Sequence, residues 1–447
     1  MNENSDTFST LKITTATNIF ITFLGIVTGI LTPRLLGPIG EGQLAAIQTW
    51  PLILAGFAQL GLSEALVYFL SSDSENGLQY VITAELLALM SSIIVFIVGW
   101  FILPIFLHSQ SKSIIDAAKV FLIVTFLYAL FGLPHGALRG IQSFKMWNIF
   151  RVVPAALWLL VVVGFMVFNL KHPIDLSRMY LIVISVTGIL CVTIIYKRIK
   201  GRAKVVPKYI GKLIKFGIPS VMTSIPQTLN LRLDQFFIIA LLPAKYLGYY
   251  VVAVAWGSGI SPIISGIGSI MFPKISADKG KHDIRFLKTG LQGGLLVGSI
   301  VGTILTLIAP IAIPIVFGNV FRGSIAPALF LVPSGVILAW AGIAEESLRG
   351  LGRPTVVLVA ESIGAITTVM SLIILLHMFG IVGAAISSLI GYTTVATVCV
   401  IAISNSTHTP IIAFILPDGY TLKWISRNVT DLAKKLLNTN NSDGQNS

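Results

Sequence analysis

Polar side chains recur at helical spacing within one otherwise apolar stretch, residues 214–242. Its members are separated by three or four residues, so on a helix they would share one face: Ser220, Thr223, Gln227, Asn230 and Asp234. A polar side chain is costly in hydrocarbon and usually faces a bundle interior or a water-filled cavity. We therefore expect this face to line a cavity. Hydrogen bonds and close contacts between helices are the alternative explanation.

Arg232 lies within the same stretch but two positions from Asp234. Two residues turn a helix by about 200°, so the two charged side chains cannot share a face. Arg232 must therefore find another partner, reach the outer interface or hold an anion. The planar donor fork of arginine suits phosphate, which makes an anion-binding role one expectation.

A weaker polar face occurs in the first apolar stretch, residues 13–32, where Asn18 and Thr22 alternate with small residues. Both helices would then contribute to one substrate cavity. The predicted cavity residues are Asn18, Thr22, Gln227, Asn230, Arg232 and Asp234.

Further charged residues lie near the predicted helix ends. Glu64 and Glu361 are deeper than the others by about 10 Å at 1.5 Å per residue. A carboxylate shielded from water takes up a proton or a cation readily, so these two are candidate ion-coupling sites. Glu85, Glu345 and Glu346 are expected to form ion pairs at the level of the lipid headgroups, and Arg349 can pair with either of the last two along one helix.

Composition dictates the elements that position these residues. Hydrophobic residues make up 55% of the 447 residues, charged residues only 11%, and the mean hydropathy is +0.88. A soluble domain would have about 25% charged residues. Because backbone groups in lipid must bond within their own segment, the apolar runs are expected to be helices. The predicted spans are 13–32, 43–70, 80–107, 117–138, 148–169, 178–197, 214–242, 246–272, 287–317, 324–348, 354–378 and 381–403.

The chain is internally duplicated. The segment from Leu35 to Trp50 is echoed 206 positions later, from Leu241 to Trp256, and Leu138-Arg139-Gly140 is echoed 210 positions later by Leu348-Arg349-Gly350. Arg139 and Arg349 thus occupy equivalent places, where they could contact an anionic headgroup or anchor the helices at the membrane surface. Duplicated polytopic membrane proteins are most often transporters.

The basic residues are unevenly distributed. Of 31 Lys and Arg residues, 23 fall on the side of the membrane that carries both termini and 7 on the other, which predicts cytoplasmic termini. We predict a first lobe at 1–197, a basic cytoplasmic linker at 198–213, a second lobe at 214–403 and a cytoplasmic tail at 404–447. Short amphipathic helices at the membrane surface are expected after Pro207 and Pro417. The net charge of +13 therefore requires no nucleic acid partner.

No metal-binding spacing, nucleotide-binding loop or catalytic group is evident, and no cofactor is expected. Cys191 and Cys399 both fall inside predicted spans, which argues against a disulfide framework.

The sequence resembles the polysaccharide-transporter family, the Wzx-type flippases of lipid-linked oligosaccharides within the multidrug/oligosaccharidyl-lipid/polysaccharide superfamily. The resemblance spans Thr15 to Ile403. It is carried by Lys215-Phe216-Gly217-Ile218-Pro219, Asn230 with Leu233-Asp234, Leu247-Gly248-Tyr249-Tyr250 with Ala253, Arg34-Leu35-Leu36-Gly37-Pro38 with Gly42, and Arg139-Gly140.

This resemblance implies about twelve transmembrane helices in two six-helix lobes, related as parallel repeats, around a central V-shaped cavity. It implies alternating access, and it makes Arg34 and Arg232 candidate diphosphate contacts. Some relatives carry a cavity arginine in the first span, whereas this chain has no charged residue there.

The expected function is to flip a polyprenyl-diphosphate glycan from the cytoplasmic to the outer leaflet of the inner (plasma) membrane, with no enzymatic activity. H⁺ or Na⁺ is the expected coupling ion, and the expected partners are membrane lipids and glycan-assembly enzymes. A cation-coupled multidrug exporter of the same superfamily is the alternative. A membrane glycan polymerase or ligase would need a larger outer loop than any predicted here.

Overall fold

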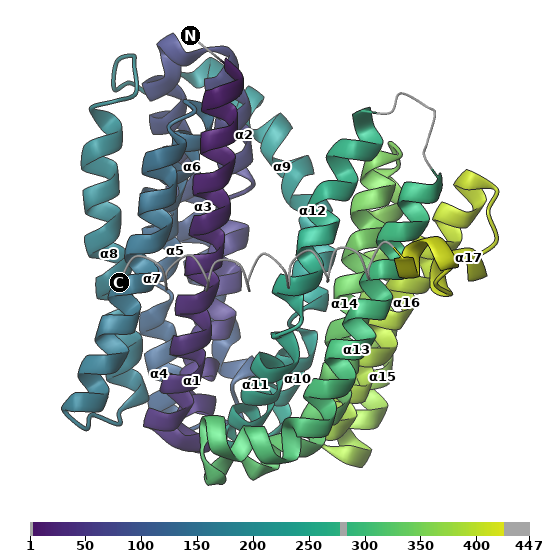
Figure 1. Ribbon diagram of the computed structural model, residues 1–447. Coiled ribbons are helices and arrows are strands. Elements are labelled where there is room, and N and C mark those ends of the chain that lie inside the picture. Colours follow the sequence, from purple (N-terminus) through teal and green to yellow (C-terminus); the bar gives the residue numbers. More distant parts are fainter. Residues whose placement is uncertain (1–2, 278–283, 424–447) are drawn as a thin grey trace, which may run out of the picture. The chain divides into compact units, whose positions relative to one another are not determined.

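The computed structural model describes residues 3–277 and 284–423, and every regular element in these two ranges is a helix (Figure 1). Nine of the described helices are long and apolar enough to cross a membrane. The all-α membrane class is thus confirmed, while the count of twelve crossings stays a prediction. The helices are α1 (Glu3–Ala58), α2 (Leu62–Ser72), η1 (Ser74–Asn76), α3 (Gly77–Phe106), α4 (Lys112–Phe121), α5 (Val124–Leu127), η2 (Tyr128–Gly132), α6 (Leu133–Gly140), α7 (Phe144–Val167), α8 (Pro173–Tyr196), α9 (Pro207–Asn230), α10 (Leu233–Leu241), α11 (Ala244–Ser258), α12 (Ser261–Ala277), α13 (Ile284–Phe317), η3 (Asn319–Ser324), α14 (Ile325–Gly350), α15 (Pro354–Phe379), α16 (Ile381–Thr407) and α17 (Ile412–Ile415).

Helix α1 contains the first predicted span and the beginning of the second, which continues into α2. Its 56 residues would extend about 84 Å if straight, more than twice the thickness of a hydrocarbon core. The backbone leaves helical geometry at Gly37, where φ is 68° and ψ is 179°. Glycine tolerates this positive φ because it has no Cβ. Gly37 therefore separates the two predicted crossings.

The chain forms two compact units. The first comprises Met1–Ala255 and Pro310–Ile325, and the second comprises Trp256–Ala309 and Ala326–Ser447. The lobes expected at 1–197 and 214–403 stay a prediction.

The first unit has a core in which helices α2, α3, α6 and α8 meet the beginning of α9. Tyr209 and Leu213 of α9 are 4% and 0% exposed, and the Tyr209 ring stacks on Tyr80 with ring centroids 3.9 Å apart. The sequence predicts a separate surface helix after Pro207. Instead, this segment forms the first turns of the long helix α9, because its apolar face packs against the first unit.

The second unit packs α12 to α16 around a core that includes Trp340, whose indole Nε1 donates to the carbonyl of Leu291 at 3.0 Å. The segment after α16 also belongs to this unit. Phe414 is fully buried, and the side-chain amide of Gln292 donates to the carbonyl of Ala413 at 2.8 Å. The amphipathic helix predicted farther along the tail lies, beyond Lys423, outside the described residues.

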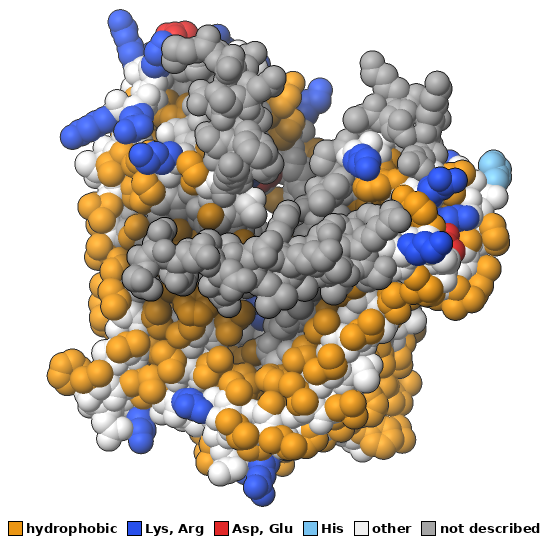
Figure 2. Space-filling view, viewed as in Figure 1, with side chains coloured by type: hydrophobic (Ala, Val, Ile, Leu, Met, Phe, Trp, Pro, Cys, Tyr) orange, Lys and Arg blue, Asp and Glu red, His pale blue; other side chains and the backbone are white. Residues whose placement is uncertain are grey.

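Large apolar side chains remain exposed along the helices. Phe101, Val167 and Leu307 are each more than 70% exposed. In Figure 2, hydrophobic side chains cover the lengths of the helices, while Lys and Arg gather mainly near helix ends. Such a surface is suited to lipid rather than to water.

Candidate functional site

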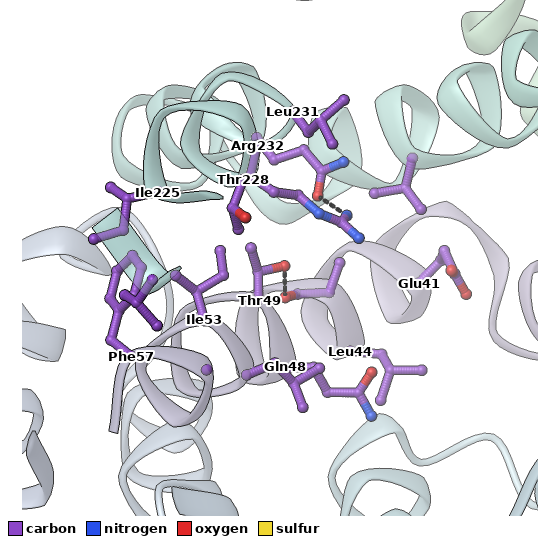
Figure 3. Close-up of a pocket in the computed structure, with 16 residues that line it drawn as sticks. Glu41, Leu44, Gln48, Thr49, Ile53, Phe57, Ile225, Thr228, Leu231 and Arg232 are labelled. Atoms are coloured by element: carbon purple, nitrogen blue, oxygen red, sulfur yellow. Dashed lines mark hydrogen bonds between the residues drawn. The ribbon is translucent and has the colours of Figure 1, made fainter. Parts of the chain in front are cut away.

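A cavity of about 600 Å³ lies in the first unit between α1 and the α9–α10 segment (Figure 3). Polar side chains from both sides line it, among apolar neighbours such as Phe57 and Ile225. The polar set consists of Glu41, Gln48 and Thr49 from α1, and Thr228, Arg232 and Gln235 from the α9–α10 segment. The cavity thus combines charged, amide and hydroxyl groups in a mainly apolar surrounding, as small-molecule sites commonly do.

Arg232 is the one Lys or Arg among the described residues that line this cavity. It lies in the break between α9 and α10, where its φ of −131° is not helical. Its guanidinium Nη1 donates to the Oε1 of Gln235 at 3.0 Å, which fixes its direction. In Figure 3 the Arg232 side chain extends from α9–α10 toward the α1 side of the cavity. Because of the break, Arg232 faces the cavity although Asp234, two residues on, does not line it.

Glu41 is the acidic residue among the described lining residues of the cavity, and it is not one of the predicted cavity residues. Its side chain is 8% exposed, and its Oε2 has no hydrogen-bond partner in the described part of the chain. A comparison of the two copies of the internal repeat would have indicated Glu41. Glu41 and Gln48 correspond, 206 positions on, to the apolar residues Leu247 and Val254. Polar residues whose equivalents in the second copy are apolar were therefore candidates for the cavity lining.

The predicted polar face lies beside the cavity lining. Gln227, Asn230 and Asp234 are not among the described lining residues; the adjacent face, which includes Val221 and Thr228, contributes instead. Asn230 and Asp234 are each 3% exposed. Their role as cavity residues stays a prediction.

Asp234 makes two short contacts at the start of α10. The hydroxyl of Tyr250 donates to its Oδ2 at 2.5 Å, and the backbone N–H of Gln235 donates to its Oδ1 at 2.7 Å. A carboxylate in the first turn of a helix is stabilised by the free N–H groups there. Asp234 thus ties α10 to α11.

The predicted cavity residues of the first span lie elsewhere. Asn18 is exposed and Thr22 is half-buried, and neither is among the described lining residues. The Thr22 hydroxyl donates to the carbonyl of Asn18 at 2.8 Å, one turn back along the same helix. Their assignment to the cavity stays a prediction.

Arg34 contacts the end of a helix. Its Nε donates to the carbonyl of Val316 at 2.5 Å, and its Nη2 donates to the carbonyl of Ile315. Both carbonyls belong to the last turn of α13, whose carbonyl groups lack partners within the helix and carry partial negative charge. The structure therefore places Arg34 as a helix-end cap, apart from the cavity lining.

Glu64 and Arg139 form an ion pair with 3.5 Å between Oε1 and Nη1. Their side chains are 55% and 41% exposed. Close packing of α2 on α6 brings them together: a Cβ on Gly136 would lie 2.3 Å from the Oγ of Ser63, and one on Gly140 would lie 2.8 Å from the Cβ of Leu70. Small residues one turn apart allow this approach.

Arg349 and three acidic residues of the second unit form one group. Arg349 pairs with Glu345 at 3.4 Å and with Glu346. Glu345 and Glu361 are 2% and 3% exposed, and their carboxyl groups share a hydrogen bond. The sequence predicts the ion pairs of Arg349 but not the hydrogen bond between carboxyls, because that depends on how α14 packs on α15.

Glu85 was expected to form an ion pair at the level of the lipid headgroups, but its partner in the structure is a hydroxyl group. It is 6% exposed and accepts a hydrogen bond from the hydroxyl of Tyr196. Helix α8 supplies this neutral partner inside the first unit.

An apolar pocket of about 330 Å³ lies on another side of the α9–α10 break. Trp50 stacks there between Phe106 and Phe236, with ring centroids 4.4 Å and 4.0 Å apart. Leu229 and Leu233 line this pocket, whereas Thr228 and Arg232 line the polar cavity. Neighbouring residues of one short segment thus contribute to an apolar space and to a polar one.

Solved structures with similar folds are membrane transporters. The lipid II flippase MurJ in an inward closed conformation matches with a TM-score of 0.72 at 16% identity, over 90% of this chain and 88% of that one. An inward-facing multidrug resistance MATE family transporter of the MOP superfamily matches with a TM-score of 0.66 at 16% identity, over 87% and 96%. The chain therefore shares its fold with these two transporters.

The sequence comparisons agree with the fold. The family described as "Polysaccharide biosynthesis protein" matches residues 10–277. An uncharacterized membrane protein of Methanocaldococcus jannaschii is 22% identical over 393 residues, 83% of this chain and 92% of that protein. The chain belongs to the polysaccharide biosynthesis protein family. Its fold is the one that these transporters and flippases share.

Proposed function

We propose that this protein flips a polyprenyl-diphosphate oligosaccharide from the cytoplasmic to the outer leaflet by alternating access. The observation that carries this proposal is the pair of spaces at the α9–α10 break, one polar with Arg232 and one apolar beside Trp50. A lipid-linked glycan has a hydrocarbon tail, an anionic diphosphate and a polar sugar in that order. The arrangement suits such an amphipathic molecule.

Arg232 contacts the diphosphate in this proposal. A guanidinium group binds phosphate oxygens through parallel N–H donors. Gln48, Thr49 and Thr228 offer amide and hydroxyl groups that suit sugar hydroxyls. The hydrocarbon next to the diphosphate lies against Trp50 and Leu233.

Coupling to H⁺ or Na⁺ takes place at Glu361 and Glu345 in the second unit. Two ionised carboxylates in hydrogen-bond contact repel each other, so a shared proton or a bound cation must compensate. Glu64 is a weaker candidate, because its carboxylate is more than half exposed and already pairs with Arg139. Membrane lipids and glycan-assembly enzymes remain the expected partners.

The direct test is transport in proteoliposomes. A polyprenyl-diphosphate disaccharide with a fluorescent label on the sugar is added to one leaflet, and its movement is followed by the loss of fluorescence to dithionite. The wild-type protein should move the label, and Arg232→Ala should reduce the rate at least about tenfold, the loss expected for one charge-assisted contact of about 1.4 kcal/mol.

Arg178→Ala serves as the control, since Arg178 pairs with Asp175 and both side chains are more than half exposed. Wild-type protein that moves no label, or an Arg232→Ala variant as fast as Arg178→Ala, would contradict the proposal.

The second candidate function is a cation-coupled multidrug exporter. The buried carboxylate Glu41 in the cavity lining favours it, because such a group can bind a cationic drug or a coupling ion. A strain that lacks the protein would then become drug-sensitive without losing surface glycan. Loss of glycan without a change in drug sensitivity supports the flippase.

A further inference from the structure

The helix turn that follows Arg139 is repeated after Arg349, 210 positions later. Helix α6 ends at Gly140 and α7 begins at Phe144; α14 ends at Gly350 and α15 begins at Pro354. At equivalent points the backbone adopts positive φ, 57° at Gln142 and 74° at Gly352. The residue after each of these donates to the carbonyl of Leu138 or of Leu348 at 2.9 Å. Residues 210 apart are therefore equivalent in structure here.

Two pairs of equivalent positions around the two turns differ in chemistry. Arg139 and Arg349 correspond, and the residues four before them are His135 and Glu345. Arg151 in the first unit corresponds to Glu361 in the second. A histidine and an arginine in one copy are thus replaced by two carboxyl groups in the other.

In the second unit the acidic residues neutralise the arginine. Arg349 pairs with Glu345 and Glu346, and Glu361 shares a hydrogen bond with Glu345. The guanidinium of Arg349 therefore pairs with carboxylates of its own unit.

In the first unit the basic residues gather around one indole ring. The guanidinium carbons of Arg151 and Arg139 lie 4.5 Å and 5.7 Å from the centre of the Trp147 ring. The imidazole of His135 is within hydrogen-bond distance, 3.2 Å, of the Trp147 carbonyl. The one acidic side chain with an ion pair to this group, among the described residues, is Glu64, which is more than half exposed.

Arg151 is the member of this group with a guanidinium nitrogen that lacks a hydrogen-bond acceptor among the described residues. Its Nη1 is buried and has no hydrogen-bond partner in the part of the chain that the structure describes. A buried N–H that has lost water without gaining an acceptor costs free energy, and more when it is charged. An anion that accepted from Arg151 would remove this cost and reduce the repulsion between the two arginines.

We infer that Arg139, Arg151 and Trp147 form a binding site for a phosphate or diphosphate ester, at the helix ends that the basic loops predict to be cytoplasmic. Glu64 is its exchangeable counterion, which the anion displaces from Arg139. Diphosphates and anionic lipid headgroups share this chemistry. If the ester is the substrate's diphosphate, the site rests on the proposed function and provides a first contact before Arg232.

Equilibrium binding to the purified full-length protein in neutral detergent tests the site, with farnesyl diphosphate as the probe. Measurements are made in the Arg232→Ala variant as well as in the wild type, so that the cavity of the proposed function does not contribute. Arg151→Gln and Arg139→Gln should each weaken binding at least about tenfold. Glu64→Gln should strengthen binding several-fold, an effect that a purely structural role of Arg139 would not produce.

Lys145→Gln is the matched control, because Lys145 is exposed on the same helix as Arg151 and its loss changes the net charge equally. Arg151→Lys keeps the charge and serves if Arg151→Gln fails to fold, as judged by size-exclusion chromatography; it should bind with an intermediate affinity. Farnesol, which lacks phosphate, should not compete.

Competition arms identify the source of the phosphate. If dioctanoyl phosphatidylglycerol does not displace the bound farnesyl diphosphate, the site is a substrate site, and if it displaces the probe effectively, the site accepts lipid headgroups. Equal binding by wild type and Arg151→Gln, or effective competition by farnesol, would overturn the inference. Because this assay involves no transport, its result is independent of whether the protein flips a glycan.

Discussion

Gly42 and Gly248, which are equivalent in the internal repeat, approach each other's helices reciprocally. A Cβ on Gly42 would lie 1.7 Å from the carbonyl oxygen of Ala244, and a Cβ on Gly248 would lie 1.9 Å from that of Pro38. Pro38 and Ala244 are themselves 206 positions apart. The contact is therefore nearly two-fold symmetric, and the sequence echo marks a contact between α1 and α11.

The first prediction concerns this contact. Gly42→Ala and Gly248→Ala should each force α1 and α11 apart, because real Cβ atoms do not approach a carbonyl oxygen so closely. Overpacking of this kind costs about 1–3 kcal/mol. We expect a lower Tm and slower transport, similar for the two variants. Gly164→Ala, where a Cβ meets nothing within 4 Å, is the control and should match the wild type.

The second prediction separates two roles of Asp234. As a tie between α10 and α11, its loss should act on stability. Tyr250→Phe should lower the free energy of unfolding by about 1.5–3 kcal/mol, since it removes a hydrogen bond to a buried charged group. In a double-mutant cycle with Asp234→Asn the two losses should not add. Unchanged stability with lost transport would instead favour the predicted cavity role.

The third prediction concerns Glu41. Glu41→Gln should raise the Tm, because the buried Oε2 lacks a partner and a neutral amide is less costly to bury. Transport should fall in the same variant if the carboxylate takes part in it. Gln48→Glu, which adds an acid to the same lining, should lower the Tm. A decrease in Tm for Glu41→Gln would show that this carboxylate is stabilising.

The fourth prediction concerns the segment after α16. Gln292 holds it through three hydrogen bonds: to Ala413, and from the Thr421 hydroxyl at 2.5 Å and the Asp418 N–H at 3.3 Å. Gln292→Leu should expose this segment to proteolysis many-fold faster. Thr397→Ala, on the exposed side of α16, should leave cleavage unchanged. Equal cleavage rates would mean that Phe414 alone holds the segment.

Hydropathy predicts the helices well because lipid allows few alternatives to a helix. It predicts the cavity face less well. The helical spacing from Ser220 to Asp234 assumes one regular helix. In the structure, however, the helix is interrupted at Leu231 and Arg232. The break exposes Arg232 to the cavity and turns Asp234 toward Tyr250. The spacing of the polar residues does not indicate this break.

The repeat was more informative than its motifs suggested. Matching residues lie at the turn after Arg139 and at the contact of Gly42 with α11. The mismatched pairs, Glu41 with Leu247 and Arg151 with Glu361, mark where the copies differ in chemistry. Their surroundings could be predicted only in part, because Arg139 near Arg151 and Glu345 near Glu361 belong to other helices.

The charges of the polar cavity have a consequence for the energy of export. Among the described lining residues, the formal charges of Glu41 and Arg232 cancel. A diphosphate held there would keep its own negative charge as it crosses. An electrical potential that is negative inside the cell would then favour its outward movement, by about 2.3 kcal/mol per charge for each 100 mV. Under the proposed function, the membrane voltage itself would contribute to the direction of transport.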